Sequence, residues 1–115
     1  MSVKPLSPYR VAFSKEGIIQ GLDAELYYNA GCTKDLSQGV ALRGMTHVDN
    51  AYNCKNVRVK GFCCKTNVTS NTAFRAFGAP QGQIVVEQAV EDIAYALSIS
   101  PSNVRFKNLY MDGDT

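Results

Sequence analysis

The stretch that decides the fold is Ile18-Ile-Gln-Gly-Leu-Asp-Ala-Glu-Leu-Tyr-Tyr-Asn29. Apolar side chains recur at every second position from Leu22 to Tyr28, and charged residues such as Asp23 and Glu25 lie between them. Such alternation is typical of a β-strand with one buried face, because successive side chains of a strand point to opposite sides. We therefore predict one long strand, with the face of Leu22 and Tyr28 directed toward a core.

The residues before this strand form its partner in a hairpin. Residues 10–14 read as a short strand, and Lys15-Glu16-Gly17 reads as a turn, in which the glycine can adopt a positive φ. Two strands joined by so short a turn pair antiparallel.

A helix is expected after the long strand. Gly31 ends the strand, and either Thr33 or Asp35 can cap a helix that runs to about Tyr52. This helix carries apolar residues on two sides, one side being the stripe of Ala41, Met45, Val48 and Tyr52, and the other Leu36 and Val40. A helix of this kind is typically wedged between two layers, so we expect more structure than the hairpin to cover it.

The second half of the chain predicts a strand, a loop and two helices. Val57–Lys65 alternates as a strand, residues 66–79 form a loop rich in small and polar residues, and Pro80 begins a helix that runs to about Leu97. The stripe of that helix contains Val86, Val90, Ile93 and Leu97. A short helix starts at Ser100-Pro101 by the same logic of cap and proline and ends near Tyr110. The fold class is therefore α+β.

Composition excludes several classes of protein. The chain has 115 residues, a net charge of +2 and 45% hydrophobic residues, which suits a folded domain and argues against a protein that binds nucleic acid through phosphates. No apolar run is long enough for a membrane span, and the first residues lack the apolar core of a signal peptide. The four cysteines lack zinc spacing, so we interpret them as reduced structural thiols of a cytoplasmic protein, with Cys63 and Cys64 in the core. The one histidine, His47, is expected to be a hydrogen-bonded structural residue.

The stretch with the most chemistry is Asn71-Thr-Ala-Phe-Arg-Ala-Phe-Gly-Ala-Pro-Gln-Gly82. It is a loop of small residues that enters a helix, and a helix N-terminus offers free N–H groups and positive potential to an anion or a polar cofactor. Small side chains also let a ligand approach the backbone. On spacing alone this is a weak signal, because loops before helices are common.

The residues of this stretch resemble a known family. They are similar to Thr-Ala-Phe-Arg-Gly-Phe-Gly-Gly-Pro-Gln-Gly of the xanthine dehydrogenases and aldehyde oxidases. Further matches follow in the same order, among them His47-Val-Asp-Asn-Ala-Tyr52, Cys64-Lys-Thr-Asn67 and Lys107-Asn-Leu-Tyr110. The resemblance extends over nearly the whole chain, so residues 1–115 are expected to be one fragment of the family's molybdenum-binding domain.

The resemblance implies a cofactor and two kinds of site residue. A molybdenum–molybdopterin centre hydroxylates a heteroaromatic ring or an aldehyde with oxygen from water, and the complete enzyme also carries [2Fe–2S] clusters and FAD, which this segment is not expected to bind. By resemblance Phe74 and Arg75 contact the molybdenum cofactor, with Arg75 near the metal. Phe77 packs against a flat substrate ring, and Arg43 faces the oxygen of a purine and supports negative charge that develops there.

Arg43 favours purines such as xanthine and hypoxanthine over aldehydes as substrates, since aldehyde oxidases usually lack this arginine. Taken without the family, Arg43 is an ordinary surface arginine and Phe77 an ordinary core aromatic residue. Ala76 and Ala79 depart from the family, which has glycine at both positions. If the backbone requires a positive φ there, alanine would disturb the fit of the cofactor.

The catalytic parts that the resemblance implies are missing from the chain. The family's general-base glutamate has no counterpart, so no catalytic residue is assigned and the fragment alone is expected to be inactive. Its partners would be the small substrate and the rest of a parent enzyme, usually a homodimer, with no nucleic acid or membrane. The alternatives are an aldehyde oxidase fragment, a non-catalytic partner-binding module that retains the fold, and an unrelated small α+β domain with a coincidental motif.

Overall fold

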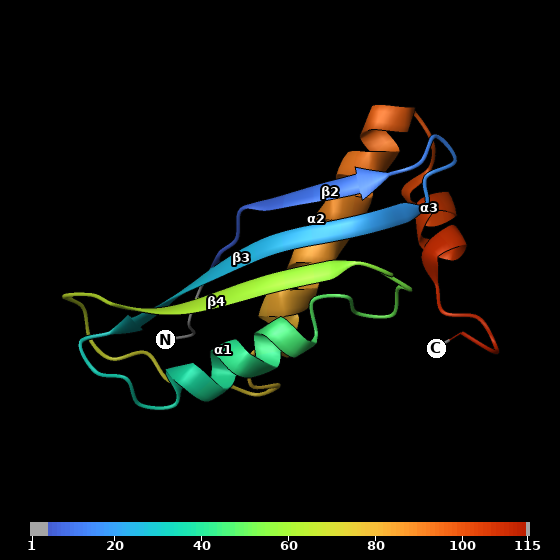
Figure 1. Ribbon diagram of the computed structural model, residues 1–115. Coiled ribbons are helices and arrows are strands. Elements are labelled where there is room, and N and C mark those ends of the chain that lie inside the picture. The colour runs from blue at the N-terminus through green and yellow to red at the C-terminus, as the bar shows by residue number, and fades with distance from the viewer. Residues whose placement is uncertain (1–4, 115) are drawn as a thin grey trace.

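The computed structural model describes residues 5–114, and Figure 1 shows them as a sheet with helices on one face. The elements in chain order are β1 (Pro5–Leu6), β2 (Tyr9–Phe13), β3 (Ile19–Gly31), α1 (Ser37–Thr46), β4 (Val57–Lys65), α2 (Ala79–Leu97) and α3 (Pro101–Asn108). This order confirms the predicted α+β succession of hairpin, helix, strand and two C-terminal helices. The two-residue strand β1 was not predicted.

The long strand β3 lies at the centre of the sheet. On one edge it pairs antiparallel with β2 (Tyr9↔Ala24) and, further along, with β1 (Pro5↔Tyr28). On its other edge it pairs with β4 in parallel, with Leu22 opposite Val57. Parallel neighbours need a crossover connection, and α1 forms part of it. The sheet and α1 thus make a β–α–β unit with a hairpin strand added to its free edge.

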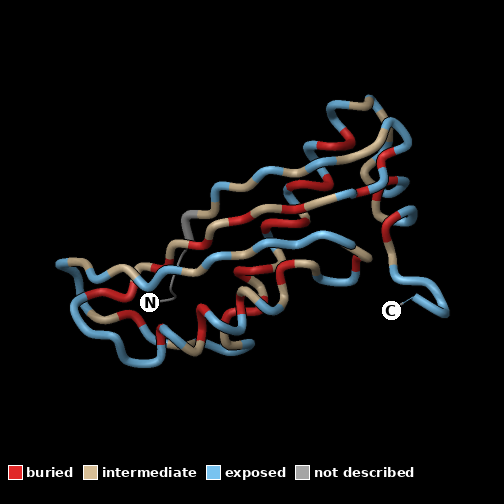
Figure 2. The backbone as a smooth tube through the Cα atoms, viewed as in Figure 1, coloured by how far each residue is buried: buried red, intermediate tan, exposed pale blue. Residues whose placement is uncertain are grey.

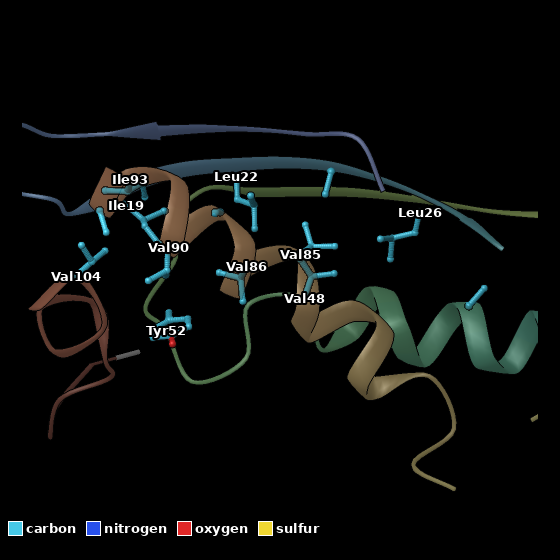
Figure 3. Close-up of a cluster of buried hydrophobic side chains, with 14 of the residues drawn as sticks. Ile19, Leu22, Leu26, Val48, Tyr52, Val85, Val86, Val90, Ile93 and Val104 are labelled. Atoms are coloured by element: carbon cyan, nitrogen blue, oxygen red, sulfur yellow. The ribbon is translucent and has the colours of Figure 1, made fainter. Parts of the chain in front are cut away.

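The alternation of β3 sorts its side chains as predicted. Leu22, Ala24, Leu26 and Tyr28 are all buried in one cluster with residues of the helices. Figure 2 shows buried and less buried positions alternating along this strand. Val86, Val90 and Ile93 of α2 meet them in one cluster, shown in Figure 3. Leu97, the fourth member of the predicted stripe, is only partly buried. Each Å² of apolar surface that is removed from water stabilises the folded state by about 25 cal/mol, so this cluster is the main source of stability.

The limits of α1 differ from the prediction. Its N-cap position is Leu36, and no side chain caps the helix, because Asp35 has a φ of 39° and the hydroxyl of Thr33 bonds to Ser70 instead. The helix stops at Thr46, not near Tyr52, and Asn50 in the turns that follow has a φ of 50°. The predicted cap and C-terminal limit of this helix were therefore wrong.

The two apolar sides of α1 are covered unequally. On one side Ala41 is buried and Met45 packs against the core, as does the buried Val48 just after the helix, and Val40 on the other side is buried as well. Leu36, however, is 51% exposed. The expected second layer exists over Val40, and it is supplied by the loop before α2.

The C-terminal helix α3 is anchored by buried polar groups. The side chain of Asn108 accepts from the N–H of Ile19 (2.8 Å) and donates to the carbonyls of Gly17 (2.8 Å) and Val104 (2.7 Å). These bonds join α3 to the turn between β2 and β3. The Ser100 side chain makes no capping hydrogen bond at the start of α3, contrary to the prediction.

A second polar junction ties α1's trailing turns to α2 and α3. Glu87 accepts hydrogen bonds from Tyr52 (2.7 Å), Asn50 (3.0 Å) and Arg105 (3.1 Å), and Arg105 also pairs with Glu91 (2.6 Å). Partial burial acts to raise the pKa of Glu87, but the hydrogen bonds from Tyr52 and Arg105 outweigh it and hold that pKa below its ordinary value.

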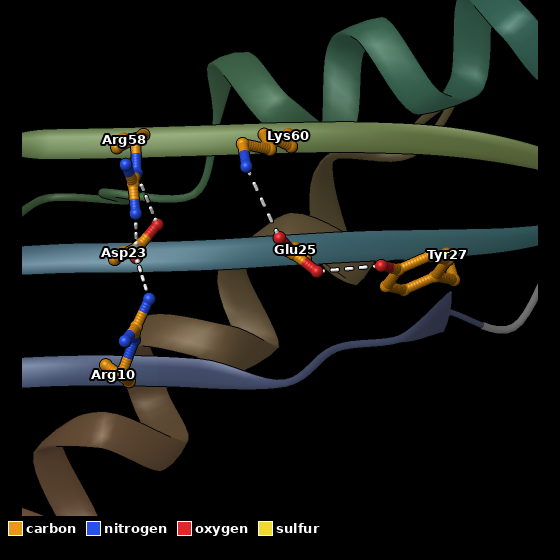
Figure 4. Close-up of polar contacts among 6 residues, drawn as sticks. All are labelled: Arg10, Asp23, Glu25, Tyr27, Arg58 and Lys60. Atoms are coloured by element: carbon orange, nitrogen blue, oxygen red, sulfur yellow. Dashed lines mark hydrogen bonds and ion pairs between the residues drawn. The ribbon is translucent and has the colours of Figure 1, made fainter.

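The outer face of the sheet carries charged pairs, shown in Figure 4. Asp23 of β3 bonds to Arg10 on one side (2.9 Å) and Arg58 on the other (2.5 Å), and Lys60 lies 3.5 Å from Glu25. The hydrogen bonds and charges of Arg58 and Arg10 lower the pKa of Asp23 to about 2. Tyr27 and Phe62 stack beside them with ring centroids 4.8 Å apart.

The remaining sequence expectations concern cysteines and histidine. All four cysteines lie in the described range and are free thiols, but Cys63 is exposed, so its assignment to the core was wrong, whereas Cys64 is partly buried. The imidazole of His47 lies 2.9 Å from the carbonyl oxygen of Arg43, which confirms a hydrogen-bonded histidine.

Within residues 5–114 no helix is long and apolar enough to cross a membrane, and no cluster of metal-ligating side chains occurs.

Candidate functional site

The loop between β4 and α2 is fastened to the end of β3. The backbone N–H of Asn71 donates to the carbonyl of Ala30 (2.9 Å), and its side-chain amide donates to the carbonyl of Asn29 (2.9 Å). The Asn29 side chain accepts in turn from the Thr66 hydroxyl (2.6 Å) and the N–H of Gly31 (3.0 Å). Gly31 has a φ of 80°, and a Cβ there would collide with the backbone of the loop. The motif therefore begins at a fixed point of the sheet.

Its other end is fixed by glycines packed against α1. A Cβ on Gly78 would collide with the backbone carbonyl of Val40, and one on Gly82 with the carbonyl of Gly44. Gly44 itself has no room for a side chain, because the hydroxyl of Tyr28 occupies that space. Backbone thus meets backbone where α2 begins, and Figure 1 shows this end of α2 next to α1. These contacts were not predicted from the sequence, although paired glycines such as Gly78 and Gly82 are a weak signal of close approach.

Three successive residues of the motif have left-handed backbone. The φ angles are 78° at Ala76, 48° at Phe77 and 99° at Gly78, and the turn is closed by the N–H of Phe77 donating to Phe74 (3.0 Å). The fold therefore requires a positive φ at position 76, where alanine is strained, and Ala79 is the first residue of α2 with ordinary helical backbone. Of the two departures from the family, only Ala76 is in conflict with the backbone.

Phe77 and Arg43 are brought to the same side of α1. The ring of Phe77 lies on Gly39, where a Cβ would be only 2.9 Å from two ring carbons. Arg43 follows Gly39 by one helical turn, and residues four apart share a face of a helix. Phe77 is partly buried against the core and Arg43 is exposed. The core-aromatic and substrate-contact interpretations of Phe77 are thus compatible, since one ring edge packs and part of the side chain remains accessible.

Phe74 and Arg75 form the first part of the turn that the Phe77–Phe74 hydrogen bond closes, and both are exposed. Phe74 is 48% exposed, although large aromatic side chains are usually covered. Among residues 5–114 neither Arg75 nor Arg43 has a carboxylate partner, whereas Arg10, Arg58 and Arg105 all do. In the same part of the chain, the backbone N–H groups of Ala76 and Gly78 bond to no carbonyl. The exposed part of the loop therefore presents a cation without a carboxylate partner among residues 5–114, an aromatic ring and the N–H donor of Ala76 together.

Tyr28 adds a buried polar atom beneath the site. Its hydroxyl has no hydrogen-bond partner within the described residues, and burial raises the pKa of this phenol to about 12. The hydroxyl therefore stays protonated at neutral pH, next to the point where Gly44 and Gly82 meet.

The comparison with known families decides the family of the chain. Residues 5–109 match the molybdopterin cofactor-binding domain. The chain belongs to this family. Xanthine dehydrogenase/oxidase of Gallus gallus is 48% identical over 109 residues, and xanthine dehydrogenase of Drosophila subobscura is 47% identical over 110 residues. These alignments cover 95% and 96% of the chain but 8% of each relative, so the chain spans about a twelfth of the length of these relatives.

Solved structures agree with this membership. The aldehyde oxidoreductase of Desulfovibrio gigas superposes with a TM-score of 0.89 at 28% identity, over 99% of this chain and 13% of that one. Quinoline 2-oxidoreductase of Pseudomonas putida superposes with a TM-score of 0.82 at 22% identity over 98% of this chain and 15% of that one, which shows the shared fold alone.

The residues of the loop fit a molybdopterin group chemically. Such a cofactor carries a phosphate and a polar pterin edge. The N–H of the exposed Ala76, which bonds to no carbonyl among the described residues, and the guanidinium of Arg75, which has no carboxylate partner there, are donors suited to both. The small side chain of Ala76, which is exposed, also leaves the backbone accessible there. The carboxylates of Glu25, Glu87 and Glu91 lie outside this loop and are engaged in the ion pairs with Lys60 and Arg105 described above.

Proposed function

We propose that this chain forms the part of a molybdenum hydroxylase where substrate and cofactor meet, and that the complete enzyme hydroxylates purines such as xanthine. The observation that carries the proposal is the convergence of the motif loop on α1, with the ring of Phe77 on Gly39 and Arg43 one turn away. The proposal also takes the chain to be one fragment of the molybdopterin-binding domain of a larger cytoplasmic, homodimeric enzyme, as the resemblance implies.

Each site residue has a proposed role. Phe74 and Arg75 contact the cofactor through the exposed turn, with Arg75 near the metal. The accessible side of Phe77 orients a flat ring without occupying its hydrogen-bonding edges. The guanidinium of Arg43, free of any carboxylate among the described residues, stabilises negative charge as it develops on a purine oxygen.

The cofactor and the rest of the enzyme supply what the chain lacks. When bound, the molybdenum–molybdopterin group supplies the transfer of oxygen from water and the uptake of two electrons, which then leave through [2Fe–2S] clusters and FAD bound elsewhere. Proton abstraction needs a general base within hydrogen-bond reach of the substrate, and the family resemblance assigns none to this chain. The general base is therefore proposed to come from another segment.

A chimera tests this function. This chain would replace the aligned 109 residues of the Gallus gallus relative, and molybdenum content and urate formation from xanthine would be measured. We expect a loaded, active enzyme, in which Arg43→Met lowers kcat/KM for xanthine roughly 100-fold but changes turnover of a small aldehyde little. Arg10→Met on the outer sheet face is the matched control. Equal losses for both substrates, or an unloaded chimera, would contradict the proposal, and the isolated chain should form no urate.

A second candidate is a non-catalytic module that binds a partner chain. Leu36 and Leu42 of α1 are 51% and 59% exposed, and such apolar residues next to a binding loop are typical of an interface. Size-exclusion chromatography and pull-down from native extract distinguish the two functions. A monodisperse monomer that captures no partner would rule out this second candidate.

A further inference from the structure

The contact between Gly39 and Phe77 has a consequence for substrate choice. A Cβ on Gly39 would lie 2.9 Å from both Cε1 and Cζ of the Phe77 ring, closer than real side chains approach one another. The far edge of the ring therefore occupies the space that a side chain at position 39 would fill.

The backbone on both sides of this contact is held by neighbouring segments. Phe77 lies within a run of three left-handed residues, and Gly78 directly after it touches the backbone of Val40. Gly39 is part of the regular helix α1, one residue before Val40. A group added at position 39 should therefore displace the Phe77 ring, which is only partly buried and has room on its accessible side.

We infer that Gly39 is a positioning residue for substrate specificity. Because Gly39 has no side chain, the ring of Phe77 packs directly on α1, and the position of this ring determines the space available to a planar bicyclic substrate. The inference rests on the proposed role of Phe77 as the residue that faces the substrate ring. A purine would fill all of that space, whereas a small aldehyde would fill only part of it. Ring displacement should therefore change the preference between these two substrate classes.

The first experiment tests the position of the ring in the 115-residue chain without any cofactor. The five phenylalanines are labelled with 4-fluorophenylalanine, and the Phe77 resonance is assigned by its loss in Phe77→Leu. In Gly39→Ala this resonance should shift, and in the control Gly21→Ala it should not, because a Cβ on Gly21 meets only Asn56 at 3.6 Å. An unmoved Phe77 resonance in Gly39→Ala would overturn the inference whatever the activity.

The second experiment tests specificity in the chimera described above. In Gly39→Ala we expect kcat/KM for xanthine to fall about tenfold more than kcat/KM for acetaldehyde, with the loss mainly in KM, since a small misplacement of a positioning group weakens a fitted substrate most. Equal changes for both substrates would overturn the inference. If the unmodified chimera hydroxylates no purine, the proposed function fails, and the fluorine measurement still decides whether Gly39 positions Phe77.

Discussion

The two faces of the sheet are stabilised in different ways. On the inner face the backbone at the start of α2 touches the backbone of α1 at Gly78 and Gly82, and neither glycine has space for a Cβ methyl group. On the outer face Asp23 is held by arginines whose side chains are 83% and 62% exposed. Packed interiors transmit small changes, whereas exposed ion pairs contribute little and are screened by salt. The candidate site is built on the inner face, where its geometry is least adjustable.

The largest expected effect is at the helix crossing. Gly82→Ala places a methyl group into the carbonyl of Gly44, and neither backbone can yield without separating α1 from α2. We expect the free energy of unfolding to fall by about 3 kcal/mol, despite the roughly 1 kcal/mol that alanine gains over glycine in a helix. Denaturant unfolding of the chain measures this loss. Gly21→Ala on the outer face is the control, and a similar loss in that variant would remove the contrast between the faces.

A buried polar junction should rank second. Asn108→Ala leaves the N–H of Ile19 and the carbonyl of Gly17 without their partner in a buried setting. Unpaired buried groups are costly, so we expect a loss of about 2 kcal/mol in the free energy of unfolding. The exposed Asn103 on the same helix offers a matched variant, Asn103→Ala, which should change stability by no more than about 0.5 kcal/mol. Hydrogen exchange at Ile19 should accelerate only in the first variant.

The motif loop should show two small effects of opposite sign. Ala76→Gly relieves the strained φ of 78° and should stabilise the chain by about 0.5–1 kcal/mol. Ala79→Gly, in the first turn of α2, should destabilise it by a similar roughly 0.5–1 kcal/mol, because glycine is poor in helices. Thermal unfolding of both variants and of the double variant checks the sign. Two changes of the same sign would mean that the loop backbone differs from that described.

The smallest effect is expected on the outer face and depends on pH. The pKa of Asp23 is lowered from its usual 3.8 to about 2 in the folded chain, so its stabilising contribution is present above the usual value and is lost as pH falls toward the lower one. Asp23→Asn should therefore lower the free energy of unfolding slightly at neutral pH, and this difference from the unsubstituted chain should shrink as pH falls between those two values. High salt should reduce the difference. An acid transition like that of the unsubstituted chain would show that the pair contributes nothing.

Much of the secondary structure could be predicted because it depends on local patterns. The alternation of Leu22 to Tyr28 and the stripe of Val86, Val90 and Ile93 record which face each element buries, and both faces are confirmed. The predictions were wrong where a tertiary contact competed with a local preference. Thr33 could cap a helix, but its hydroxyl bonds to Ser70, which is distant in sequence and could not be identified from the pattern.

The candidate site was predictable only through its motif. Phe74, Arg75, Phe77 and Arg43 were chosen by resemblance, and their functional roles stay predictions. The spacing of residues gave no reason to bring Arg43 and Phe77 together, because they come from segments more than thirty residues apart. Gly39, Gly44 and Gly82 were overlooked, since a glycine has no side chain and its importance depends on what packs against it.

The sequence by itself determined the order of strands and helices, the buried face of β3 and α2, and membership of a family whose motif spans residues 71–82. Only the tertiary structure decided that β4 pairs in parallel with β3, that α2 meets α1 through glycine contacts, and that Phe77 lies on Gly39. The physical reason is range. Periodicity follows from the geometry of a single helix or strand, whereas close approach between two segments depends on the shape of both surfaces at once.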